Sequence, residues 1–224
     1  MTRIYFVRHA EAEGNVKEFF QGRINCDISE KGAVQLGYLA KRFENIEYDT
    51  IYSSPLKRAM ATAKAVNSRL QLPIIEREDL IEINGGVWEG KLWTEIEKEY
   101  PAEHELWKND MKHFSVKDGE CMTEVYERMK NAVAEIVREN RDKTVVVVSH
   151  GCALRNYLAY AEFGSMDMLG EVGWSDNTAV SLIEYDDNFA PKIVFKNDSS
   201  HLPPEASTLA FSRWSKYDEK EDVK

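Results

Sequence analysis

The chain has 224 residues, 43% of them hydrophobic, and a formal net charge of −10 at pH 7. A chain of this length can bury a core without disulfides or a structural metal. Its acidic charge is spread along the sequence, which argues against nucleic acid or an anionic membrane as the main partner, and we expect neither.

The three cysteines, Cys26, Cys121 and Cys152, are odd in number and widely spaced. Such a set is typical of reduced thiols and not of a disulfide framework or a zinc site. The N-terminus shows no signal-peptide pattern, and no run reaches about 18 apolar residues. The sequence therefore predicts a soluble protein of the cytoplasm.

In chain order, β-branched and aromatic runs predict three buried parallel strands at 3–7, 49–53 and 144–148. Each run is followed by a turn and a helical pattern. Ser29 precedes a predicted helix that extends to about Asn45. Ser54 and Pro55 predict another helix over 55–71, with Ser54 as its N-cap and Pro55 in the first helical position.

Residues 120–140 carry apolar side chains at spacings of three and four, which predicts an amphipathic helix. A further helix is expected after His150. Near the end of the sequence, 178–185 and 191–195 flank a turn-like segment and predict a hairpin at the sheet edge. Strands that alternate with helices indicate an α/β fold: a three-layer α/β/α sandwich with a mostly parallel central sheet.

We expect a single domain over residues 1–224, with two segments of different composition. The segment from about 84 to 119 combines aromatic residues with many lysines and glutamates, and it predicts short helices that form a small cap. Its aromatic side chains are more typical of a cap core than of a substrate platform, although one or two could face a pocket. The tail 216–224 has seven charged residues in nine and is expected to be a solvated end.

The ends of the three predicted strands carry polar side chains that suit an anion. Arg8 and His9 end the first, Arg58 follows the second, and His150 and Gly151 follow the third. In parallel α/β sheets, ligands bind beyond the carboxyl ends of the strands. Arginine forks and helix N-termini favour phosphate there, and a neutral histidine can accept a phosphoryl group.

Other readings of single residues stay open at this point. One histidine at a strand end is more often structural than a nucleophile, although two histidines with two arginines are harder to explain in that way. Cys152 lies two positions after His150, and such residues do not face each other on a helix, which disfavours a Cys–His dyad. His104, His113 and His201 show no metal-ligand spacing, so we expect no metal site.

Five motifs in order resemble the histidine phosphatase superfamily, the phosphoglycerate mutase-like family. They are Val7-Arg8-His9-Ala10-Glu11-Ala12-Glu13-Gly14-Asn15, Gly22-Arg23 with Asp27-Ile28-Ser29-Glu30-Lys31-Gly32, Ser53-Ser54-Pro55-Leu56-Lys57-Arg58-Ala59, Glu82-Ile83-Asn84-Gly85-Gly86-Val87-Trp88-Glu89-Gly90 and Val148-Ser149-His150-Gly151. The resemblance covers roughly residues 2–185. Two positions depart from the family signature: Ala10 replaces its usual glycine and Ala12 its common threonine.

The resemblance implies a role for each matching residue. His9 would accept the phosphoryl group, Glu82 would donate a proton to the leaving oxygen, and Arg8, Arg58 and a protonated His150 would bind the phosphoryl oxygens. The second nitrogen of His9 is expected to donate to a backbone carbonyl. Further phosphate or substrate contacts are implied for Asn15, Gln21, Gly22 and Gly151. Neither a metal nor a cofactor is required.

Three functions are compatible with these motifs. We favour a phosphatase that acts on a small phosphomonoester, because the family's mutases use an arginine pair in the cap, whereas no arginine lies between Arg77 and Arg128 here. A cofactor-dependent phosphoglycerate mutase is the first alternative. A non-catalytic phospholigand-binding module is the second, although binding alone needs no proton donor such as Glu82. The sequence leaves the substrate and a homodimer open.

Overall fold

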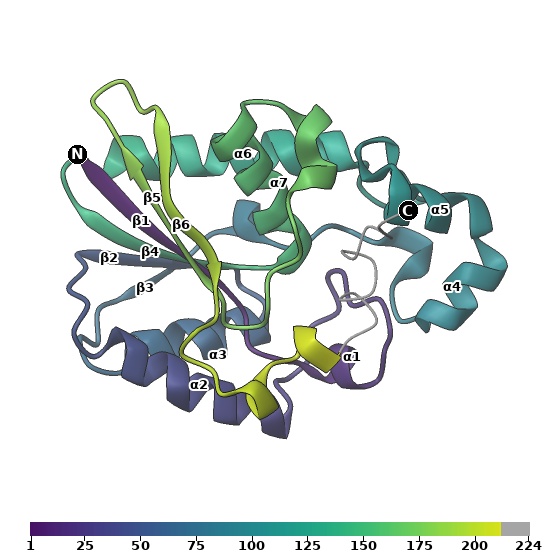
Figure 1. The fold of residues 1–224 in the computed structure, drawn as a ribbon, viewed down its shortest axis with the longest axis horizontal. Coiled ribbons are helices and arrows are strands. Elements are labelled where there is room, and N and C mark those ends of the chain that lie inside the picture. The colour runs from purple at the N-terminus through teal and green to yellow at the C-terminus, as the bar shows by residue number, and fades with distance from the viewer. Residues whose placement is uncertain (212–224) are drawn as a thin grey trace, which may run out of the picture.

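The protein is represented by a computed structural model that describes residues 1–211, and the predicted charged tail at 216–224 lies outside them. A six-stranded sheet has the order β3-β2-β4-β1-β5-β6 (Figure 1). Strands β3, β2, β4 and β1 run parallel, and β5 is antiparallel to both of its neighbours. The strand bounds are Thr2–Arg8 (β1), Thr50–Ser53 (β2), Ile74–Glu76 (β3), Thr144–Ser149 (β4), Val180–Tyr185 (β5) and Pro191–Asp198 (β6).

Helices cover both faces of this sheet (Figure 1). Their bounds are Glu13–Val16 (α1), Glu30–Phe43 (α2), Lys57–Val66 (α3), Trp93–Glu99 (α4), Pro101–Asn109 (α5), Met122–Glu139 (α6) and Gly151–Phe163 (α7). Short 3₁₀ turns span Glu78–Leu80, Gly86–Trp88, Met111–His113, Met166–Glu171, Pro204–Ala206 and Leu209–Phe211. No helix among residues 1–211 combines the length and the apolar character that crossing a membrane requires.

The side chains of the central strand β4 alternate between the two faces of the sheet, which explains why helices pack on both. Val145 and Val147 pack with α6 and α7 in one core cluster, whereas Val146 and Val148 pack with α2 and α3 in the other. Because successive side chains of a strand point to opposite faces, a run of four valines buries both faces at once. The predicted α/β/α sandwich with a mostly parallel sheet is thereby confirmed.

Most predicted elements are present near their expected bounds. The strands at 3–7, 49–53 and 144–148, the helices at 29–45 and 120–140, and the edge hairpin correspond to β1, β2, β4, α2, α6 and β5–β6. Ser29 caps α2, since its Oγ accepts a hydrogen bond from Gly32 N at 2.9 Å. Strand β3 was not predicted, because three residues are too few to show a period.

The start predicted for the helix at 55–71 is wrong. Helix α3 begins at Lys57, and Leu56, not Ser54, occupies the N-cap position. Ser54 is fully buried, and its Oγ lies 2.7 Å from Nε2 of His150, so its hydroxyl serves a contact between strand ends instead of a cap. The helix ends at Val66, where the Asn67 side chain bonds the backbone N and O of Leu72.

The segment predicted as a cap contains α4, α5 and two of the 3₁₀ turns, and it lies beside the carboxyl end of the sheet (Figure 1). Trp88 is fully buried at its centre and packs edge-on against Phe20 and at a tilt against Trp107 and Phe114, with ring centroids 5.5, 5.9 and 4.9 Å away. The cap core thus joins the main core, and Phe20 links it to the loop that follows α1.

Candidate active site

The strand register brings the two predicted site histidines side by side. Arg8 of β1 pairs with Ser149 of β4, so His9 and His150 leave the sheet next to each other, with ring centroids 5.1 Å apart. Beyond these strand ends lies a cavity of about 330 Å³. Eight of the nine predicted residues line it: Arg8, His9, Asn15, Gln21, Gly22, Arg58, Glu82 and Gly151.

His9 is held in one tautomer by the backbone carbonyl of the next residue, Ala10. Its Nδ1 lies 2.7 Å from the carbonyl oxygen of Ala10 and donates to it, which leaves Nε2 unprotonated in the neutral ring. Burial, together with the positive charges of Arg58 and Arg8, keeps the pKa of His9 well below its ordinary value. The carbonyl of His9 accepts hydrogen bonds from the Asn177 side chain and the Thr178 backbone.

Two guanidinium groups flank His9. Arg58 is 1% exposed and donates from Nη1 to Ile24 O and from Nη2 to Gly22 O, at 2.8 and 2.7 Å. Arg8 donates to the carbonyl of Ser175. In both arginines Nε is buried without a partner, and an unpaired buried donor is costly, so each can bind an anion in the cavity.

His150 does not line the cavity, unlike the other predicted residues. It is fully buried at the N-cap position of α7, with Nε2 bonded to Ser54 Oγ and Nδ1 without a partner. Burial and the nearby charge of Arg58 hold its pKa well below the ordinary value. These effects disfavour a protonated His150 in the absence of an anion, whereas a phosphate dianion beside the ring would raise its pKa. The protonated state expected from the sequence stays a prediction.

Glu82 reaches the cavity from the irregular segment between the 3₁₀ turns Glu78–Leu80 and Gly86–Trp88. Its Oε1 accepts from Ile83 N and Ala153 N, both at 3.0 Å, and its Oε2 accepts from Cys152 N at 3.1 Å. Two of these donors belong to the first turn of α7, whose backbone N–H groups have no acceptor within the helix. The carboxyl group is thus fixed beside the strand ends.

Of the remaining predicted residues, Asn15 lies in α1, Gln21 and Gly22 follow it, and Gly151 begins α7. The Oδ1 of Asn15 accepts from Ala12 N and from the Gln21 side chain, at 3.0 and 3.2 Å, so its amide NH₂ is the group available to a ligand. Gly22 has a φ of +47°, which a glycine tolerates without strain. A Cβ on Gly151 would stand 3.2 Å from Cζ of Arg8, so this glycine lets the guanidinium lie against α7.

The two departures from the family signature leave this geometry intact. Ala10 is fully buried and does not have a positive φ, so a glycine is not required there. Its N donates to Thr62 Oγ1 at 2.9 Å. Ala12 cannot cap α1 with a side chain, and Asn15 accepts the hydrogen bond from its N instead.

Several cavity residues were not predicted individually. They come from the cap (Trp93, Glu97, His104 and Trp107) and from the chain after α7 (Trp174, Asn177, Thr208 and Leu209). Asn177 stands in a polar run before a strand, a pattern that indicates only a turn. Within residues 1–211, no three His, Cys, Asp or Glu side chains form a group that could hold a metal ion.

Comparisons with known proteins agree with this geometry. The family model of the histidine phosphatase superfamily (branch 1) matches residues 4–199. Phosphoserine phosphatase 1 of Hydrogenobacter thermophilus is 34% identical over 190 residues, which are 84% of this chain and 88% of that protein. The structure of YhfR from Bacillus stearothermophilus is 32% identical, with a TM-score of 0.86 over 90% of this chain and 99% of that one. The chain belongs to the histidine phosphatase superfamily, branch 1.

Proposed function

We propose that this protein hydrolyses phosphomonoesters of small metabolites through a phosphohistidine at His9. The observation that carries the proposal is the tautomer of His9: its Nδ1 is occupied by Ala10 O, which leaves Nε2 unprotonated, and Arg8 and Arg58 line the same cavity. A neutral imidazole nitrogen is a nucleophile, and the arginines attract the phosphate that it attacks.

In the first step, the lone pair of His9 Nε2 forms a bond to phosphorus while the bond from phosphorus to the ester oxygen breaks. Arg8 and Arg58 stabilise the charge on the phosphoryl oxygens, and this electrostatic contribution supplies most of the catalysis. The protonated carboxyl group of Glu82 gives its proton to the leaving oxygen, so the alcohol departs uncharged.

In the second step, water attacks the phosphorus of the phosphohistidine. Glu82, now a carboxylate, accepts one proton of this water, and the N–P bond breaks so that the electron pair returns to Nε2. Phosphate leaves and His9 regains its neutral tautomer. His150 would turn its unpartnered Nδ1 to a phosphoryl oxygen, and Asn15 would donate from its NH₂ group.

A relative's name and the residues of the cavity wall together suggest which substrates to test. Phosphoserine is the first, because the relative from Hydrogenobacter thermophilus is named a phosphoserine phosphatase. Besides Arg8 and Arg58, the described cavity wall includes Lys31, whose Nζ bonds to Ser207 O and lies 4.0 Å from Glu11. The cap helices α4 and α5 contribute no arginine, which favours hydrolysis over phosphoglycerate mutase activity.

We further infer that the protein works in the cytoplasm, since Cys26, Cys121 and Cys152 are free thiols, two of them buried. Assembly into a homodimer stays a prediction.

Turnover of an aryl phosphate tests the proposal. His9→Ala is expected to lose essentially all activity, and quenching the working wild-type enzyme in alkaline detergent should trap phosphate on the protein that is stable to base and labile to acid. His113→Ala, on the exposed end of the 3₁₀ turn Met111–His113, is the control and should keep wild-type activity. Substantial turnover by His9→Ala would refute the nucleophile, and absence of turnover in the wild type would favour the binding module.

A further inference from the structure

Glu82 follows the 3₁₀ turn Glu78–Leu80 in a segment without helix or strand, and the carbonyl groups from Asp79 to Glu82 are held one after another by side chains. Carbonyl oxygens of Asp79 and Ile81 accept from Arg128, at 2.9 and 2.8 Å. The carbonyl between them, of Leu80, accepts from Ser149 Oγ at 2.7 Å. The next one, of Glu82, lies 3.4 Å from Nε of Arg23.

Arg128 is the centre of this arrangement. It projects from α6, and besides the two carbonyls it donates from Nε and Nη2 to the two oxygens of Glu120, each at 3.0 Å. Glu120 in turn accepts from Asn84 N at 2.8 Å, on the other side of Glu82. One guanidinium therefore fixes the chain both before and after the proposed proton donor.

The ion pair of Arg128 with Glu120 is largely shielded from water, with side chains 18% and 16% exposed. Burial by itself would raise the pKa of Glu120, but the hydrogen bonds from Arg128 and Asn84 and the charges of Arg128 and Arg23 lower it. A bidentate pair in such surroundings is directional, and lysine cannot reproduce the fork.

We propose that Arg128, with Glu120, is the positioning residue that aims the carboxyl group of Glu82 at the leaving oxygen. Proton transfer requires a donor within about 3 Å of the acceptor oxygen, and small displacements of such a group are costly. The inference rests on the proposed function of Glu82. It predicts that loss of Arg128 lowers kcat/KM most for esters whose leaving oxygen must be protonated as it departs.

Two aryl esters of similar shape test this dependence. Phenyl phosphate releases a basic phenolate that needs protonation, whereas 4-nitrophenyl phosphate releases a weakly basic one. For Arg128→Gln we expect kcat/KM to fall about ten- to a hundredfold with phenyl phosphate and less than about threefold with 4-nitrophenyl phosphate, within the range of general acid catalysis. Arg128→Lys should not restore the loss.

Arg3→Gln is the matched control, because Arg3 also donates from Nε and Nη2 to one glutamate, Glu184, but at the start of β1, away from the cavity. It should leave both kcat/KM values unchanged. In a Glu82→Gln background, the Arg128→Gln change should add no further loss that depends on the leaving group.

Equal losses on both esters, or a selective loss that persists without Glu82, would overturn the inference. If Arg128→Gln does not fold, as judged by its melting transition, Glu120→Gln takes its place in the comparison of the two esters. It should show the same selective loss with phenyl phosphate. A wild-type protein that hydrolyses neither ester would instead refute the proposed function, so the two failures are distinguishable.

Discussion

Arg58 illustrates how single residues at this site serve both structure and chemistry. Two of its nitrogens hold the backbone of Gly22 and Ile24, and the third, Nε, is buried without a partner. The guanidinium thus organises one wall of the cavity while keeping a donor for an anion. Its burial is tolerable because an arginine keeps its charge even where burial lowers its pKa.

A first prediction follows for Arg58. Orthophosphate or vanadate should raise the melting temperature of the wild type in proportion to occupancy, because each binds only the folded state. Arg58→Ala should abolish most of this shift, and Arg58→Lys should restore little of it, since lysine lacks the planar fork. Thermal scans with increasing anion test both variants, and an undiminished shift in Arg58→Ala would place the anion elsewhere.

A second prediction concerns two buried histidines, His9 and His150, and the partly buried His201. Burial and the charge of a neighbouring arginine, Arg58 or Arg42, depress the pKa values of His9, His150 and His201, that of His201 to about 4. The unfolded chain therefore binds protons at a higher pH than the folded one. Stability should be lost as pH falls from about 6.5 toward 4, by at most about 1.4 kcal/mol per pH unit for each histidine.

Urea unfolding of the wild type and of His201→Gln at about pH 7 and about pH 5 checks this slope. His201 bonds Arg42 through Nδ1 and Thr178 through Nε2, and a glutamine can serve both while removing the titration. The variant should lose less stability between the two pH values than the wild type or the surface control His113→Gln. Equal pH dependence in all three proteins would contradict the assignment.

At the scale of elements, the start of α2 is hydrogen-bonded to the loop between β1 and α1, which carries His9. The Oγ of Ser29 accepts from Gly32 N and donates to Oε1 of Glu11, at 2.9 and 2.7 Å. Glu11 is buried, lines the cavity and also accepts from Thr208 Oγ1. A helix cap is therefore part of the same network as the cavity wall.

A third prediction is that Ser29→Ala lowers the free energy of unfolding by about 1–2 kcal/mol, because it removes the cap of α2 and one partner of a buried carboxylate. Ser68→Ala, an exposed position after α3, is the matched control and should change stability by no more than about 0.5 kcal/mol. Chemical denaturation of both variants gives the comparison. A loss in Ser29→Ala no larger than in the control would show that the cap contributes little.

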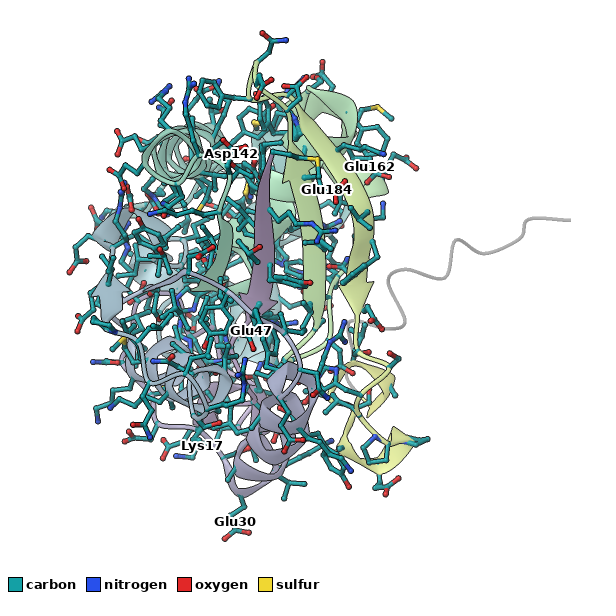
Figure 2. All side chains as sticks on the ribbon, turned by 90° about the vertical axis from the view of Figure 1, so that its left-hand side faces the viewer. Lys17, Glu30, Glu47, Asp142, Glu162 and Glu184 are labelled. Atoms are coloured by element: carbon teal, nitrogen blue, oxygen red, sulfur yellow. The ribbon has the colours of Figure 1, made fainter. Side chains whose placement is uncertain are left out.

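At the scale of the whole molecule, the proposed anion site lies in a strongly acidic protein. Figure 2 shows charged side chains projecting around the outside, including Glu30, Glu47 and Glu162, which are exposed. The guanidinium groups of Arg8 and Arg58 lie inside, at the cavity. Because surface charges are screened by salt and buried ones much less, the local cations can hold a phosphate despite the net charge of −10.

A fourth prediction concerns the reaction of the whole enzyme. With 3-phosphoglycerate and a bisphosphoglycerate primer, phosphate release should exceed formation of 2-phosphoglycerate. A mutase must retain an intermediate that carries both phosphate and carboxylate, and the lysines of the cap replace bidentate arginines poorly. Both products are followed in one assay, with His9→Ala as the blank. Isomerisation about tenfold faster than release, equivalent to about 1.4 kcal/mol in barrier, would contradict the phosphatase.

The sequence by itself determined five of the six strands, most of the helices and the residues at the strand ends. The valines of β4 and the apolar spacing of α6 are local patterns whose period identifies the element. Because parallel strands end at one edge, Arg8, His9 and His150 could be expected together without a structure.

Only the tertiary structure decided the hydrogen-bond partners of those residues and how deeply each is buried. Ser54 bonds His150 across 96 positions of sequence and does not cap a helix, and burial lowers the pKa of His150. Arg128 reaches the carbonyls of Asp79 and Ile81 from 49 and 47 positions away. Hydrogen bonds and desolvation depend on neighbours that are distant in sequence, and no local period encodes them.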